Sequence, residues 1–265
     1  HALRESFKFA GCEECWITVT SVAPSYEGDL AFVGMVNVRD AMRQPTEKAL
    51  SDAREAALSA GAMIKTVYEE GEPYERIVDL AEAENCDLIV TGRTGKGGIK
   101  KTLIGSVAAR VIGYSRTDVL VVPPEAEIGW SKILFATDGS KFSEEAEAKA
   151  IDFAKSYGSQ LKVIRVVDVP AEFYAESPNT LETMIEKARM GVVKIKRRAE
   201  SEGVDTETFI GQGESPDIIL NFAKEMEIGT IILGSHGRTG LRRLLMGSVA
   251  EKVIGYAPCP VLIAR

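Results

Sequence analysis

One pattern of glycines occurs twice in this chain, and the two copies are 142 residues apart. The pattern is Gly-x-x-Gly, nine further residues and then Gly-Ser; it occupies Gly92, Gly95, Gly105 and Ser106 in the first copy and Gly234, Gly237, Gly247 and Ser248 in the second. Near-identical amphipathic segments follow at 107–114 and 249–256. Self-similarity at a fixed spacing indicates repeated structure, so we expect two copies of one fold.

The second half of the chain alternates apolar runs with amphipathic segments. We expect strands at 132–137, 161–167, 206–210, 229–233 and 260–264, and helices at 143–157, at 181–201, from Pro216 and from Ser248. Continuous apolar strands separated by helices are typical of a parallel sheet that is covered on both faces.

The first half repeats this order with one element missing. We expect helices at 2–10, 46–60 and 74–84 and strands at 16–22, 63–67, 87–91 and 118–123, with an insertion at 25–45. When helix 2–10 is aligned with the helix after Asp138, the opening strand of the first copy falls before residue 1. We therefore expect this sequence to lack that strand. The predicted domains are 1–124 and 130–265, joined by a short linker that keeps the two copies packed together.

Composition narrows the class of protein. The chain has 265 residues, 45% of them hydrophobic and 27% charged, and a net charge of −7. This is typical of a globular protein, and the negative charge argues against general affinity for nucleic acids. No apolar run is long enough to span a membrane and no signal peptide is visible, so we expect a cytoplasmic protein. With two histidines and an isolated Cys12–Cys15 pair, no metal site is predicted.

The glycine loops are candidates for phosphate binding. Glycines between a strand and a helix let the backbone approach a pyrophosphate, and the first N–H groups of the helix can donate to it. Ser106 and Ser248 could cap these helices and touch a phosphate, while Arg238 could neutralise its charge. Asp138, at the end of another strand, could accept hydrogen bonds from ribose hydroxyls. The alternative is that these residues only shape turns and helix caps.

These features together resemble the universal stress protein family. The resemblance covers nearly the whole chain as two tandem domains. It rests on the glycine motif in both halves and on Ala136-Thr-Asp-Gly-Ser140 in the second. It implies an α/β fold with two tandem, doubly wound, Rossmann-like parallel sheets of five strands in the order 3-2-1-4-5, the first without its opening strand.

The resemblance also implies ATP or another adenine nucleotide as the ligand. By position, Asp138 and Val166 would hold the adenosine end, and Leu233 and Gly234 would line the ribose. The expected nucleotide-binding residues are Thr137, Asp138, Val166, Leu233, Gly234, Gly237, Arg238, Gly247, Ser248 and Val249, the last five for the phosphates. A partial second site would consist of Val22, Gly92, Gly95, Gly105, Ser106 and Val107, without the Asp.

We expect a stress-response or regulatory protein that binds the nucleotide without efficient turnover, because no general base stands out near the loop. No catalytic residue is assigned, and Mg²⁺ could accompany the phosphates. Two alternatives stay open: a slow ATPase or autophosphorylating enzyme with Ser248 or Ser106 as acceptor, and a nucleotide-free interaction module. Family members pair through their last strands, so we expect 118–122 and 260–264 to pair within the chain; two chains could also form a homodimer.

Overall fold

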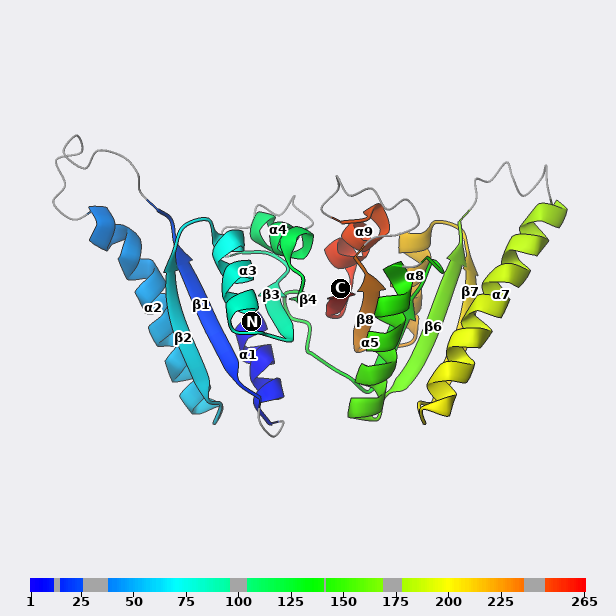
Figure 1. The fold of residues 1–265 in the computed structure, drawn as a ribbon, viewed down its shortest axis with the longest axis horizontal. Helices are drawn as coiled ribbons and strands as arrows, with labels where there is room; N and C mark the ends of the chain where they lie inside the picture. Colours follow the sequence, from blue (N-terminus) through cyan, green and yellow to red (C-terminus); the bar gives the residue numbers. More distant parts are fainter. Residues whose placement is uncertain (12–14, 26–37, 96–103, 141, 169–177, 236–245) are drawn as a thin grey trace. The chain divides into compact units, whose positions relative to one another are not determined.

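The computed structural model describes residues 1–11, 15–25, 38–95, 104–140, 142–168, 178–235 and 246–265. These residues form two compact units, His1–Cys86 and Asp87–Arg265, which are described one at a time. Each unit combines strands with helices that pack on them (Figure 1). The α/β fold that the sequence predicts is confirmed.

The first unit contains a two-stranded parallel sheet. Its elements are α1 (Ala2–Ser6), the 3-10 helix η1 (Phe7–Gly11), β1 (Ile17–Ala23), α2 (Val38–Ser59), β2 (Ile64–Glu70) and α3 (Pro73–Ala83). β1 pairs with β2 along the full length of both strands. Phe7, Ala57 and Ala62 form a buried cluster, against which Leu3 and Ile17 pack. The unit therefore has a small hydrophobic core of its own.

The second unit contains both glycine loops and the larger sheet. Its elements are β3 (Leu88–Gly92), α4 (Ser106–Tyr114), β4 (Asp118–Val122), β5 (Lys132–Ala136), α5 (Phe142–Tyr157), β6 (Gln160–Val167), α7 (Pro178–Ser201), β7 (Thr206–Gln212), α8 (Ser215–Glu225), β8 (Thr230–Gly234), α9 (Ser248–Tyr256) and β9 (Val261–Ala264). The seven strands form one sheet in the order β3-β4-β9-β8-β5-β6-β7. Neighbouring strands are parallel except β4 and β9, which pair antiparallel with Leu120 opposite Leu262.

Successive strands of the second repeat are added first on one side of β5 and then on the other. β6 and β7 follow on one side of β5, whereas β8 and β9 lie on its other side, which is the order 3-2-1-4-5 within this repeat. Because strand–helix–strand crossovers are right-handed, α5 and α7 cover one face and α8 and α9 cover the other. Consistently, α7 packs on β6 and β7, and α8 packs on α9. Open α/β sheets bind ligands at the carboxyl ends of strands where the order reverses, here β5 and β8.

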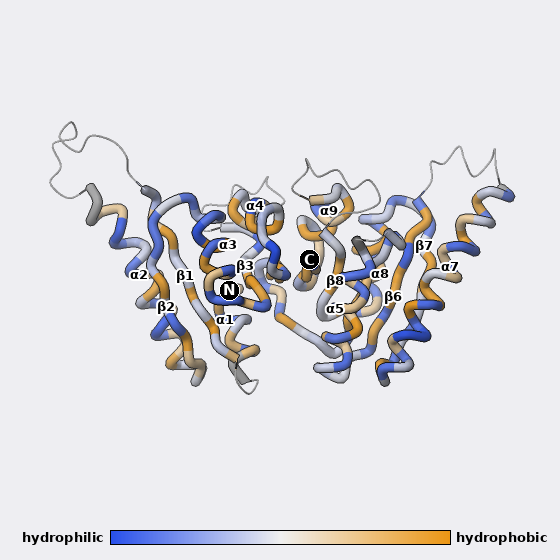
Figure 2. Tube along the Cα trace, in the orientation of Figure 1, coloured by the Kyte–Doolittle hydropathy of each residue, from blue (hydrophilic) through white to orange (hydrophobic). Residues whose placement is uncertain are grey.

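The strands of the second unit are buried on both faces. Ile133, Leu134 and Phe135 of β5 are 0% exposed, and so are Ile231 of β8 and Leu262 of β9. Consecutive apolar residues are what a doubly covered sheet requires, and each fully buried side chain contributes about 1.5–3 kcal/mol. Figure 2 shows hydrophobic residues along these strands and hydrophilic residues interspersed along α7.

The strands of the first repeat are divided between the two sheets. β1 and β2 form the two-stranded sheet, whereas β3 and β4 extend the seven-stranded one. In the order 3-2-1-4-5 the opening strand lies between the second and fourth strands, here β1 and β3. Among the described strands, β1 pairs with β2 and β3 pairs with β4, and no strand joins β1 and β3 in one hydrogen-bonded ladder. Within the described residues, the second repeat is the one whose five strands lie side by side in one sheet.

An ionic cluster ties β4 to its neighbours. The buried Asp118 carboxylate accepts a hydrogen bond from the backbone N–H of Arg265 at 2.9 Å. It also pairs with Nζ of Lys149 from α5 at 2.9 Å. A buried carboxylate needs such partners to offset its loss of water, so the cluster favours the observed register of β4 against β9.

One helix begins earlier than predicted. The helix expected at 46–60 is α2, which starts at Val38 and continues through Pro45. Proline is best tolerated in the first turn of a helix, which is why the sequence favoured a start after it. Residues 26–37 of the insertion predicted at 25–45 lie outside the described residues.

Within the described residues, no helix is long and apolar enough to cross a membrane. The same residues contain no group of three or more His, Cys, Asp or Glu side chains that could hold a metal ion. Cys259 is a buried free thiol, whereas Cys12 lies outside the described part of the chain. Burial raises the pKa of the Cys259 thiol to about 12, so it stays protonated at neutral pH.

Candidate functional site

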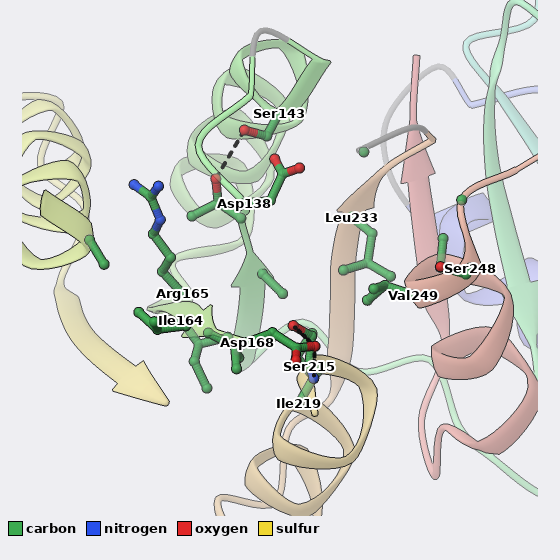
Figure 3. A pocket seen from close by; sticks show the side chains of 18 of the residues that line it. Asp138, Ser143, Ile164, Arg165, Asp168, Ser215, Ile219, Leu233, Ser248 and Val249 are labelled. Atoms are coloured by element: carbon green, nitrogen blue, oxygen red, sulfur yellow. Dashed lines mark hydrogen bonds between the residues drawn. The ribbon is translucent and has the colours of Figure 1, made fainter. Parts of the chain in front are cut away.

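The carboxyl ends of β5, β6 and β8 open into a cavity of about 440 Å³ in the second unit. Residues of α7, α8 and α9 supply the remaining walls (Figure 3). The volume lies in the range of small-molecule sites. The cavity thus lies where the strand order reverses, the expected place for a ligand in an open α/β sheet.

The loop after β5 is fixed by hydrogen bonds within it. Thr137 Oγ1 accepts from the N–H of Gly139 at 3.0 Å and donates to Ser143 Oγ at 3.0 Å. Ser143 Oγ in turn donates to the Ser140 carbonyl at 2.8 Å. Asp138 Oδ1 accepts from the N–H of Ser140 at 2.9 Å, which forms a local turn. This network holds the Asp138 carboxylate at the cavity wall.

α9 begins at the cavity with a glycine in place of a capping side chain. Its N-cap is Gly247, which has φ −71° and ψ 149° and makes no side-chain cap. The N–H of Gly247 donates to the Ser235 carbonyl at 3.2 Å and so closes the loop. The first N–H groups of a helix lack partners within the helix, and the helix dipole is positive at this end. The start of α9 is therefore suited to an anion such as a phosphate.

The wall on the other side of the cavity from α9 is mostly apolar. Ile164 and Val166 of β6, Ile219 of α8 and the first turns of α7 contribute to it (Figure 3). Asp168, just after β6, accepts hydrogen bonds from the N–H and the hydroxyl of Ser215 at 3.0 and 3.2 Å. Ser215 is the first residue of α8, so this carboxylate caps a second helix. Apolar surface with a few fixed polar groups suits a base and sugar better than a phosphate.

Most of the residues that the sequence singled out meet at this cavity. Its lining includes Thr137, Asp138, Val166, Leu233, Gly234, Gly247, Ser248 and Val249. The other two, Gly237 and Arg238, fall at 236–245, outside the described residues. The fold thus gathers two strand ends, one loop and one helix start that lie far apart in the sequence. Their role in nucleotide binding stays a prediction.

The sequence did not predict the contributions of α7 and α8, nor those of Arg165 and Asp168 on either side of Val166. Arg165, Asp168, Met184, Lys187 and Ser215 also line the cavity. The α7 residues belong to no motif and reach the cavity only because that helix packs on β6 and β7. A signal did exist for Ser215, because Gly213-Glu-Ser-Pro216 marks a helix start at the carboxyl edge of the sheet.

The helix after the first glycine motif starts in the same way as α9. Gly105 is the N-cap of α4, with φ −64° and ψ 144°, and its N–H donates to the Arg93 carbonyl at 2.8 Å. Arg93 Nη1 donates to the carbonyl of Ala257, which caps the end of α9, at 3.0 Å. Partial burial lowers the pKa of this guanidinium.

The residues expected for a partial second site fall in both units. Val22 belongs to β1 of the first unit, whereas Gly92, Gly95, Gly105, Ser106 and Val107 belong to the second. Their role in a second site stays a prediction.

The model of the Universal stress protein family matches the chain twice, over residues 1–123 and 129–265. The universal stress protein MJ0531 of Methanocaldococcus jannaschii is 39% identical over 142 residues, which cover 51% of this chain and 82% of that protein. A universal stress protein of Mycolicibacterium smegmatis is 25% identical over 244 residues, covering 86% of this chain and 77% of that protein. The crystal structure of a universal stress protein from Archaeoglobus fulgidus has the same fold, with a TM-score of 0.72, 24% identity, and coverage of 100% of this chain and 90% of that one.

Proposed function

The chain belongs to the universal stress protein family, and from this premise we propose that its second repeat binds ATP or another adenine nucleotide. The phosphates would lie at the start of α9, against Gly247 and Ser248. The adenosine would extend across the cavity to Asp138 and Val166. The protein would act by holding this nucleotide, as a stress-response or regulatory protein.

The observation that carries the proposal is that one cavity joins an anion-favouring helix start to a carboxylate on the opposite side. The α9 end offers backbone N–H groups and a positive dipole. The β5 end offers the Asp138 carboxylate, an acceptor for ribose hydroxyls, in a loop fixed by its own hydrogen bonds. Leu233, only 5% exposed, lies between them as apolar surface. A ligand with phosphates at one end and a nucleoside at the other matches both ends.

We propose binding without efficient turnover because both carboxylates at the cavity already accept hydrogen bonds from other residues of the protein. Asp138 accepts the Ser140 N–H and Asp168 accepts two hydrogen bonds from Ser215. Both carboxylates are thus engaged in a turn and in a helix cap. Mg²⁺ would enter on the phosphates rather than in a cage of protein ligands.

Titration calorimetry of the whole chain with ATP tests the proposal, together with mass spectrometry of gently purified protein. We expect saturable ATP binding, a co-purifying adenine nucleotide, and negligible release of inorganic phosphate over many minutes. Rapid phosphate release would support the slow-enzyme alternative. A chain that carries no nucleotide and binds neither ATP, ADP nor AMP would favour the nucleotide-free interaction module.

We also propose that the two repeats associate through their last strands. The antiparallel pairing of β4 with β9 and the Asp118 cluster support this. A homodimer of two chains and a cytoplasmic location stay predictions from the sequence. Light scattering of the purified chain tests the homodimer.

A further inference from the structure

Arg165 lines the same cavity from β6, although no motif includes it. Neighbouring side chains of a strand point to opposite faces, so Arg165 points away from the face of Ile164 and Val166. It points to the face covered by α5 and α7. Figure 3 shows its guanidinium extending toward the Asp138 loop, on the side of the cavity away from α9. The guanidinium therefore lies against Gly139, the residue that follows Asp138.

Two glycines leave room for this guanidinium. A Cβ at Gly139 would lie 2.7 Å from Arg165 Nη1 and 2.8 Å from its Cζ, and a Cβ at Gly191 would lie 2.7 Å from the same Nη1. Gly139 has φ +73°, which favours glycine for backbone reasons alone. Gly191 is different, because it lies inside α7, where glycine is a poor helix former. The space that the guanidinium needs accounts for this glycine.

The first repeat has neither the arginine nor the glycine. The registers of β1 on β2 and of β6 on β7 make Ser21 the counterpart of Arg165. The matching ends of α2 and α7 make Ala49 the counterpart of Gly191. The first repeat thus has serine on β1 and alanine, with its Cβ, on α2. The arginine and the glycine thus occur together, in the repeat that has the complete cavity.

We propose that Arg165 is a nucleotide-binding residue that acts on the nucleoside end of the ligand, and that Gly191 provides the space in which its guanidinium lies. This inference rests on the proposed function of the cavity. A guanidinium has five N–H donors and no acceptor, whereas the ionised Asp138 carboxylate has only acceptors. A nucleoside offers partners to both, because its ring nitrogens and sugar oxygens accept while its hydroxyl and amino groups donate.

Calorimetry of the full chain with ATP and with adenosine tests the role of Arg165. Arg165→Ser introduces the serine that the first repeat has at this position. It should lower the affinities for ATP and for adenosine by the same factor, roughly ten- to a hundredfold, as expected for the loss of a charged hydrogen bond. A variant at the phosphate end, Ser248→Ala, should weaken ATP and leave adenosine unchanged. The matched control is Arg198→Ser. Arg198 also faces α5, where it pairs with Glu147 at 3.2 Å, but it lies outside the cavity, so this variant should change neither affinity.

Gly191→Ala separates binding from folding. Alanine is the better helix former, so this variant should melt at a temperature no lower than the wild type. Its Cβ would displace the guanidinium, so both ligands should weaken about as much as in Arg165→Ser. In the double variant Arg165→Ser/Gly191→Ala, the second substitution should add no further loss, because no guanidinium is left to displace.

Two results would overturn the inference and leave the proposed function intact. One is that the wild type binds ATP and that Arg165→Ser binds both ATP and adenosine as tightly as the wild type does. The other is weakened binding in Arg165→Ser with a lowered melting temperature, while Gly191→Ala binds normally, because that combination indicates a structural role. A wild type that binds neither ligand contradicts the proposed function itself.

Discussion

The two glycine motifs lead into helices that start in the same way but have different surroundings. α4 and α9 each begin with a serine that follows a glycine N-cap. The N–H of each glycine donates to the backbone carbonyl of the residue after a strand, at 2.8 Å to Arg93 and 3.2 Å to Ser235. Beside α9 lies a cavity with the Asp138 loop as its other side. Beside α4, Arg93 instead binds the end of α9. The motif supplies a helix start with free donors, but a nucleotide site also needs a second wall, which among the described residues is seen beside α9.

The largest expected effect comes from a side chain at the start of α9. Gly247→Val would place a branched side chain where the phosphates bind and should weaken ATP binding about a thousandfold (~4 kcal/mol), since two or more charged hydrogen bonds would be lost. The matched variant is Gly105→Val at the start of α4. Both glycines have extended φ and ψ that valine adopts easily, so neither change strains the backbone. Calorimetry of both variants with ATP measures the difference.

Gly105→Val should change ATP affinity by less than about threefold, within the scatter of a surface substitution. Equal losses in the two variants would contradict the asymmetry between the loops. Circular dichroism of both proteins shows whether each variant is folded before the affinities are compared.

The next effect concerns stability where β4 meets β9. Asp118→Ala removes a buried carboxylate from beside Lys149 and the N–H of Arg265, and should lower the free energy of unfolding by about 3 kcal/mol. The counterpart of Asp118 in the second repeat is Pro260, so this contact too is asymmetric. A urea titration followed by circular dichroism measures the change. Lys149→Met leaves the buried carboxylate without its lysine partner, so it should also lower the free energy of unfolding, and two variants as stable as the wild type would contradict this account.

A smaller loss of stability is expected at the first loop. Arg93→Ala removes the hydrogen bond to the Ala257 carbonyl and should lower the free energy of unfolding by about 1–2 kcal/mol. ATP affinity should stay within about twofold, because Arg93 is not among the residues that line the cavity. Thermal melting and calorimetry on the same preparation measure both quantities. A tenfold drop in ATP affinity without loss of stability would mean that the first loop takes part in binding.

The smallest effect is expected from the two serines. Neither helix has a side-chain cap from its N-cap residue, and Ser106 and Ser248 are both exposed, so replacing either with alanine should leave the melting temperature unchanged. Ser248→Ala should weaken ATP binding about fivefold, the typical loss for one neutral hydrogen bond, and Ser106→Ala should not. Incubation with radiolabelled ATP also tests the enzyme alternative. Labelling of the wild type that disappears in Ser248→Ala would identify that serine as a phosphoryl acceptor.

Much of the second repeat could be predicted from the sequence. The strands expected at 161–167 and 229–233 are β6 and β8, each placed within one residue. They could be predicted because they are mostly apolar segments of strand length, as a doubly covered sheet requires, and Gly229 and Gly234 flank the second one. The strand-end positions of Asp138 and the glycine loop were predictable for the same reason.

The rest could not be predicted because it depends on packing between distant segments. Arg165 belongs to a strand and Met184 to a helix, and both reach the cavity only through the way α7 lies on β6. The division of the first repeat between two sheets depends on which strands find a neighbour, and local patterns do not record this. Gly191 carried no signal, since its meaning depends on the arginine that lies against it.

The most direct test of the central claim is a crystal structure of this chain grown with Mg²⁺ and ATP. Our account predicts one adenine nucleotide for each chain, with its phosphates at the N–H groups of Ser248 and Val249 and its adenosine between Asp138 and Val166. A nucleotide bound at the Gly105 loop while the cavity beside α9 stays empty at saturating ATP would contradict it.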